Sequence, residues 1–149
     1  MKNIIARAST IINTTAPEVW EALTSPDMIK EYFFGTHAES TWKVGSPITF
    51  TGVYEGKGYR DKGTILRVEP NKLLQHTYWS SMSGLEDKPE NYVSITYHLT
   101  EENGQTILEV TQENVPSDEM KEHAEENWKK VLSNMKQLLE NKTVHVNGL

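Results

Sequence analysis

Hydrophobic residues recur at intervals of three and four between residues 116 and 141, after a long stretch dominated by strand-like alternation. This spacing predicts one amphipathic helix that opens at Pro116-Ser117-Asp118-Glu119 and ends near Asn141. Its apolar stripe consists of Met120, Ala124, Trp128, Val131, Leu132, Met135, Leu138 and Leu139. Large residues crowd only the second half of the stripe. We therefore expect that half to pack on a sheet and the first half to lie over a cavity.

The start of the chain predicts a strand followed by two short helices. Residues 4–12 are β-branched and alternate imperfectly, as in a strand. Thr15-Ala16-Pro17-Glu18 then resembles a capping box, in which the Thr15 hydroxyl accepts from a helical N–H and Glu18 reaches back to the Thr15 N–H. Ser25 and Pro26 predict the cap and the first turn of the second helix.

Six more strands are predicted between turn-forming residues, at 37–42, 48–54, 59–69, 73–80, 92–100 and 106–114. Gly104 suits a positive φ in the last hairpin, whereas Gly56-Lys57-Gly58 is expected to bend the middle of the sheet. Residues 81–91 are polar and predict a loop. The order of elements predicts an α+β fold with an antiparallel sheet and the helices on one face.

Composition narrows the class of protein. A length of 149 residues suits one domain, which we place at 1–141, with 142–149 as a flexible tail. The net charge of −6 disfavours nucleic acid and anionic membranes as partners. The absence of cysteine excludes disulfides and thiolate chemistry. We expect a cytoplasmic protein, because no signal sequence or membrane-spanning apolar stretch is evident.

A single helix over a curved sheet tends to leave a gap, and a gap lined by apolar and aromatic side chains is a ligand pocket. The alternative is a core filled by side chains. Strand alternation places Leu74, His76 and Tyr78 on the inner face, although the opposite set of 73, 75, 77 and 79 is almost as plausible. The predicted ligand-binding residues are Tyr32, Phe33, Phe50, His76, Tyr78, Ile95, Tyr97, Val110, Gln112, Met120, His123, Ala124 and Trp128.

Candidate polar chemistry is sparse. His76, Gln112 and His123 could orient a ligand hydroxyl or carbonyl, or each histidine could be satisfied by backbone or exposed to water. Glu119, His123 and Glu126 have helical spacing suited to a metal, but an acidic face near a helix start is favourable without one. Gly52, Gly56 and Gly58 precede a strand rather than a helix, so no phosphate loop is expected. We predict no metal site, no cofactor and no catalytic constellation.

Several packing motifs carry a resemblance to a known family. They are residues 12–24, Gly63-Thr64-Ile65 leading to Pro70, Leu74-x-x-Thr77-Tyr78, Thr106-x-Leu108-x-Val110 and Trp128-x-x-x-Leu132. In these motifs the chain resembles the START-like superfamily, also called SRPBCC or helix-grip. Within it, the chain is most similar to stand-alone bacterial homologues of the C-terminal domain of the heat-shock-chaperone ATPase activator. The resemblance implies a curved antiparallel sheet wrapped around a long C-terminal helix.

The resemblance implies binding of a small hydrophobic molecule such as a lipid, a polyketide or a flavonoid-like aromatic. One alternative is a cyclase or dehydratase that uses His76 with Tyr78 or Tyr97. Another is a co-factor of a chaperone ATPase in the stress response, with a heat-shock chaperone as its partner. Tyr32-Phe33 stands where many relatives carry Trp-Phe, and Gln112 stands where many carry histidine.

Overall fold

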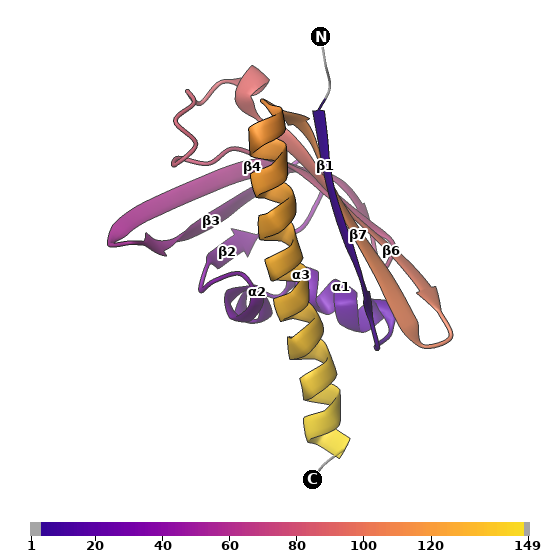
Figure 1. Ribbon diagram of the computed structural model, residues 1–149. Helices are drawn as coiled ribbons and strands as arrows, with labels where there is room; N and C mark the ends of the chain where they lie inside the picture. Colours follow the sequence, from indigo (N-terminus) through magenta and orange to yellow (C-terminus); the bar gives the residue numbers. More distant parts are fainter. Residues whose placement is uncertain (1–3, 148–149) are drawn as a thin grey trace.

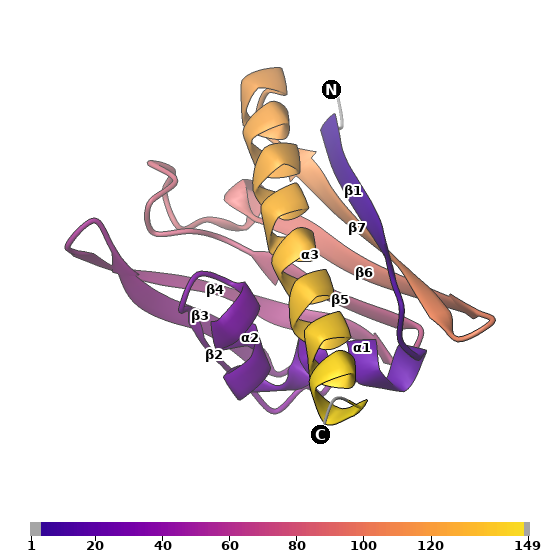
Figure 2. The same cartoon turned by 60° about the horizontal axis from the view of Figure 1, so that its bottom comes forward.

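The computed structural model describes the backbone of residues 4–147 and the side chains of residues 4–141. Its elements in chain order are β1 (Ile4–Ile12), α1 (Ala16–Thr24), α2 (Pro26–Tyr32), β2 (His37–Ser40), β3 (Pro47–Tyr54), β4 (Lys57–Glu69), β5 (Leu73–Tyr78), the 3-10 helix η1 (Pro89–Asn91), β6 (Val93–Glu102), β7 (Gln105–Val115) and α3 (Asp118–Asn147). The strands form one antiparallel sheet in the order β1-β7-β6-β5-β4-β3-β2. Helix α3 crosses one face of this curved sheet, with α1 and α2 on the same side (Figures 1 and 2). The predicted α+β fold is confirmed.

Strand β4 joins the two parts of the sheet. It pairs with β3 along its first half and with β5 along its second half. A Cβ atom built on Gly63 would lie 1.7 Å from the carbonyl oxygen of Thr77 on β5. Only glycine allows this close approach of the two backbones. Gly63 is therefore required where β4 passes from pairing with β3 to pairing with β5.

The prediction that Gly56-Lys57-Gly58 bends the sheet is wrong. Glu55 and Gly56 have φ of 49° and 79° and form the two-residue turn between β3 and β4. Two positive φ angles suit a tight hairpin, whose twist matches that of the flanking strands. Asn103 and Gly104, with φ of 52° and 78°, make the same kind of turn between β6 and β7, as predicted for Gly104.

The two short helices begin in different ways. Ser25 caps α2 as predicted, because its Oγ accepts from the Met28 N–H at 3.5 Å. The capping box at Thr15 is wrong, since the Thr15 side chain makes no cap hydrogen bond. Instead, Glu101 on β6 accepts from the Ala16 N–H at 2.6 Å. A residue far away in sequence thus supplies the acceptor that an N-cap side chain usually supplies.

Helix α3 buries its second half against the sheet, as predicted. Its most buried residues are Trp128, Val131, Leu132, Met135 and Leu139, which join the main hydrophobic core. The helix continues to Asn147 instead of ending near Asn141, and residues 148–149 of the predicted tail lie outside the described residues. Within the described residues, no helix combines the length and apolarity needed to cross a membrane.

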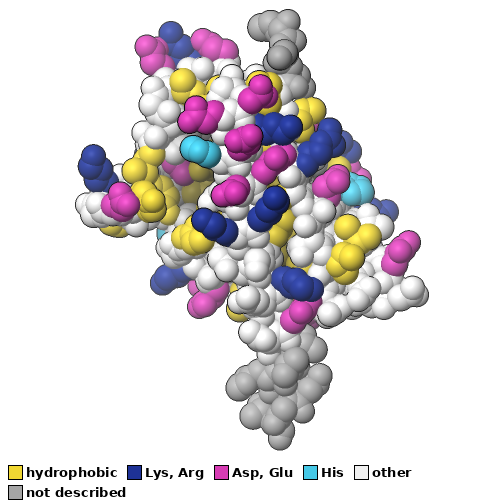
Figure 3. Space-filling model, in the orientation of Figure 1, with side chains coloured by type: hydrophobic (Ala, Val, Ile, Leu, Met, Phe, Trp, Pro, Cys, Tyr) yellow, Lys and Arg dark blue, Asp and Glu magenta, His cyan; other side chains and the backbone are white. Residues whose placement is uncertain are grey.

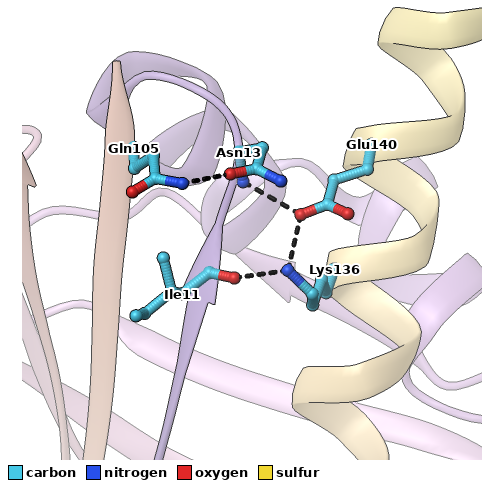
Figure 4. Close-up of polar contacts among 5 residues, drawn as sticks. All are labelled: Ile11, Asn13, Gln105, Lys136 and Glu140. Carbon is cyan, nitrogen blue, oxygen red and sulfur yellow. Dashed lines mark hydrogen bonds and ion pairs between the residues drawn. The ribbon is translucent and has the colours of Figure 1, made fainter. Parts of the chain in front are cut away.

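Polar side chains of α3 cover the free edge of β1 (Figure 4). Glu140 accepts from the Asn13 N–H at 3.0 Å, and Lys136 donates to the Ile11 carbonyl at 2.6 Å. Lys136 and Glu140 also form an ion pair at 2.7 Å. Nearer the start of the helix, Glu125 accepts from the Arg7 N–H at 3.0 Å. These bonds fix α3 along the edge strand and occupy groups that could otherwise pair with another strand.

Candidate functional site

A pocket of about 170 Å³ lies between the sheet and the first half of α3, which we call the chamber. Its walls come from the end of α2, from β3 and β5–β7, and from one turn of α3. The lining residues are Phe33, Phe50, His76, Tyr78, Ile95, Tyr97, Gln112, Ala124, Asn127 and Trp128. The chamber exists because the apolar stripe of α3 carries only the small side chain of Ala124 in this turn of the helix. The large residues that seal the core begin at Trp128.

Five rings form a closed belt around the chamber. In order they are Phe33, Phe50, His76, Tyr97 and Trp128, with successive centroids 6.3, 5.8, 5.6 and 5.8 Å apart. The Trp128 and Phe33 centroids lie 6.0 Å apart with the two rings nearly perpendicular, and this contact closes the belt. Rings in mutual contact hold one another in place and present flat apolar surfaces. The belt is therefore suited to hold a flat or apolar group.

Polar atoms inside the belt are already engaged with one another. His76 Nδ1 lies 2.8 Å from the Thr77 carbonyl oxygen, so Nδ1 carries the proton and donates. His76 Nε2 is then the acceptor for the Tyr97 hydroxyl at 3.3 Å. Across the chamber, the Trp128 indole donates to Gln112 Oε1 at 2.9 Å, which leaves the amide nitrogen of Gln112 as the group able to donate to a ligand.

Burial keeps these groups neutral. His76 is only 1% exposed, and its desolvation lowers the pKa of the imidazole to about 4, despite an opposing contribution from the bond to Thr77. Burial also raises the pKa values of the Tyr97 and Tyr78 hydroxyls well above their usual range. At pH 7 the inner wall thus presents a neutral imidazole and two protonated phenols.

The chamber adjoins a wider opening of about 470 Å³, which we call the mouth. The mouth shares Phe33, Phe50 and Asn127 with the chamber. Its other lining residues are Phe34, Thr36, Val53, Tyr54, Tyr59, Asp61, Met82 and Lys130. Phe34, Val53, Tyr54 and Met82 are between 48% and 72% exposed. Hydrophobic side chains accordingly gather over the β3–β4 hairpin beside α3 (Figure 3).

A carboxylate lies where the two spaces meet. Asp61 lines the mouth, and its Oδ2 accepts from the hydroxyl of Tyr78, which lines the chamber. Nearby, Tyr59 Oη lies 2.5 Å from Thr36 Oγ1, which also lines the mouth. Gly52 permits this arrangement, because a Cβ there would lie 2.5 Å from the Tyr59 hydroxyl.

The structure brings most of the predicted ligand-binding residues to the chamber. Tyr32 instead borders a void of about 20 Å³ deeper in the core, and Val110 is buried in that core. Met120 and His123 are exposed on α3, so their placement in the cavity wall is wrong. The reason is that the chamber begins about one helical turn later, at Ala124. A role in binding stays a prediction for all of these residues.

Of the residues that line the mouth, sequence reasoning predicted only Phe33 and Phe50. Asn127 and Lys130 follow Ala124 at helical spacing, a signal that could have placed them on the chamber side of α3. Phe34, Tyr54 and Met82 lie in or next to turns, where no periodicity predicts the direction of a side chain. Among the described residues, no group of three or more His, Asp and Glu side chains could hold a metal ion.

A family model supplies the identification. The model described as Activator of Hsp90 ATPase homolog 1-like protein matches residues 13–140, which include the chamber and most of the sheet. The chain belongs to this family. The family resemblance found in the packing motifs is thereby confirmed.

Solved structures of similar proteins extend this comparison. The chain is 42% identical to ChR145 from Cytophaga hutchinsonii, with a TM-score of 0.83 and coverage of 97% of this chain and 99% of that one. The Aha1 dimer from Colwellia psychrerythraea is 24% identical, with a TM-score of 0.69 and coverage of 94% and 97%. Ara h 8.0201 shares the fold at 11% identity and a TM-score of 0.75, with coverage of 94% and 99%. No curated protein matches the sequence significantly.

Proposed function

We propose that this protein binds a small, mainly apolar molecule in the chamber, with the mouth as its route of entry. The observation that carries the proposal is the closed belt of five rings around a space of about 170 Å³. A ligand that packs on the rings would gain dispersion contacts and would remove their apolar surface from water.

The polar pattern supports binding over catalysis. A general base needs a free lone pair within reach of the substrate proton. His76 uses Nδ1 on Thr77 and Nε2 on the Tyr97 hydroxyl, and its imidazole is a weak base because its pKa is about 4. The cyclase or dehydratase hypothesis, which relied on His76, therefore has less support than ligand binding. A lipid, polyketide or flavonoid-like aromatic remains the proposed ligand class.

A second proposal is a role as co-factor of a heat-shock chaperone. Its support is the family match over residues 13–140 and the similarity to a protein named as an Aha1 dimer. It predicts a change in the ATPase rate of a purified Hsp90-type chaperone when this protein is added. An unchanged rate throughout a titration to excess would contradict this second proposal.

Native mass spectrometry of wild-type protein and Ala124→Phe tests the binding proposal. Ala124 is half-buried in the chamber wall, and a phenyl group there would occupy the space of a ligand. The expected result is an additional mass on the wild-type protein that is lost on denaturation and is absent from the variant. An equal additional mass on both proteins would contradict the proposal, because the bound molecule would then lie outside the chamber.

A further inference from the structure

Asp61 is a buried carboxylate that apolar ligand binding leaves unexplained. It lies on β4, is only 7% exposed and lines the mouth. Oδ2 accepts from the Tyr78 hydroxyl, and Oδ1 accepts from the Ser81 N–H at 3.2 Å. These two bonds fix the orientation of the carboxylate. Each oxygen keeps room for a further donor, because a carboxylate can accept about four hydrogen bonds.

The negative charge of Asp61 has no cationic partner among the described residues. The ion pairs found there are Lys62–Asp87, Arg67–Glu69, Lys88–Glu86 and Lys136–Glu140. Buried carboxylates are usually paired with a cation, because burial removes the water that stabilises their charge. Tyr78 and Ser81 contribute only neutral donors. A positively charged group entering the mouth would therefore meet an oriented and uncompensated anion.

The rings around the mouth favour the same kind of ligand. Aromatic faces attract cations through their quadrupole, and this attraction is strongest where water is excluded. Five aromatic residues line the mouth, namely Phe33, Phe34, Phe50, Tyr54 and Tyr59. Lys130 also lines it and would repel a cation, but this residue is exposed on α3, where water and salt screen its charge. The buried anion and the rings thus outweigh the exposed ammonium.

We propose that the mouth selects ligands that carry a protonated amine, which Asp61 binds while the apolar body of the ligand lies in the chamber. This inference rests on the proposed function, because it needs the chamber to accept the apolar body. It adds the chemical class of the head group. Tyr78, which lines the chamber and donates to Asp61, connects the two parts of the site.

Three probes with one apolar body test the inference, namely 3-phenylpropylamine, 3-phenylpropanol and 3-phenylpropionate. Their dissociation constants can be measured by NMR titration of the wild-type protein and of Asp61→Asn. The variant keeps the size of the side chain and one oxygen acceptor, so the fold should be retained. We expect the amine to bind about tenfold more tightly than the alcohol to the wild type, as for a charge-assisted hydrogen bond, and equally with the alcohol to Asp61→Asn.

Asp87→Asn is the matched control, because it removes the same charge from an exposed carboxylate that pairs with Lys62 outside the mouth. It should leave the tenfold preference unchanged. Alcohol binding without an amine preference would overturn the inference and leave the proposed function intact. Preferred binding of the propionate, lost in Lys130→Gln, would also overturn it. Failure of all three probes to bind would overturn the inference and count against the chamber as a binding site.

Discussion

At the scale of single residues, burial of His76 has the largest chemical consequence. The imidazole is one of the five rings of the belt, it is bonded to Thr77 and Tyr97, and its pKa is lowered to about 4. In the unfolded chain the same group has a pKa near 6.5. The unfolded state therefore binds more protons between pH 4 and 6.5, and the folded state loses stability as the pH falls through this range.

Because of the lowered pKa of His76, the free energy of unfolding should decrease by about 3 kcal/mol between pH 7 and pH 4. Urea unfolding at a series of pH values measures the decrease. His76→Gln keeps a donor and an acceptor but does not titrate, so its stability should depend less on pH over the same range. Equal pH dependence in the two proteins would show that His76 is not the buried group responsible.

Residue patterns in the sequence favoured the inner faces of the strands without settling all of them. Alternation only slightly favoured Leu74, His76 and Tyr78 over the opposite set of β5, and the first two are almost completely buried. It did not identify Asp61, because a charged residue in a strand is ordinarily assigned to the outer face. Asp61 is buried because Tyr78 and Ser81, which come from other segments, satisfy its carboxylate. Such long-range bonds leave no periodic signal.

At the scale of elements, β4 connects the mouth to the core. Its first half carries Tyr59 and Asp61 beside the mouth, and its second half carries Ile65 into the core. The two halves meet at Gly63, where β4 approaches β5 too closely for any side chain. The position of Asp61 beside Tyr78 therefore depends on this close approach.

Gly63→Ala should lower the free energy of unfolding by at least about 3 kcal/mol, because its methyl group would overlap the Thr77 carbonyl. Gly58→Ala is the matched control on the same strand. Its methyl group would meet only the Gly52 carbonyl oxygen at 3.9 Å, an ordinary contact. Chemical denaturation should show a change within about 1 kcal/mol for the control. Equal effects of the two substitutions would contradict the close approach of β4 to β5 at Gly63.

The order of elements was predictable because most elements carry a clear period and most turns carry glycine, proline or asparagine. The errors occurred where distant segments decide the local structure. Glu101 of β6 replaces the expected Thr15 cap, and the Thr77 carbonyl of β5 leaves no room for a side chain at Gly63 of β4. The prediction that the first turns of α3 lie over the cavity was also wrong for Met120 and His123. Both side chains are exposed, since the chamber begins at Ala124.

At the scale of the whole molecule, the chamber lies between the sheet and the first half of α3, beside the firmly packed second half of that helix. The second half of α3 is sealed to the core, and its polar side chains are bonded to β1 (Figure 4). The β3–β4 hairpin extends on the other side of the helix and forms one wall of the mouth (Figures 1 and 3). The sequence predicted the chamber through the sparse first half of the helical stripe. Phe34 and Met82 of the mouth were not predictable, because they lie in turns, where no periodicity gives the direction of a side chain.

The central claim is that the chamber accepts small apolar molecules, and NMR of the indole N–H groups tests it most directly. The Trp128 indole is bonded to Gln112 in the chamber wall, whereas the Trp79 indole is bonded to Leu85 outside it. In a titration with a panel of small aromatic and aliphatic molecules, the Trp128 signal should shift saturably with at least one compound while the Trp79 signal stays in place. The shift should disappear in Ala124→Phe. Equal shifts at both indoles, or a Trp128 shift that persists in the variant, would contradict the account.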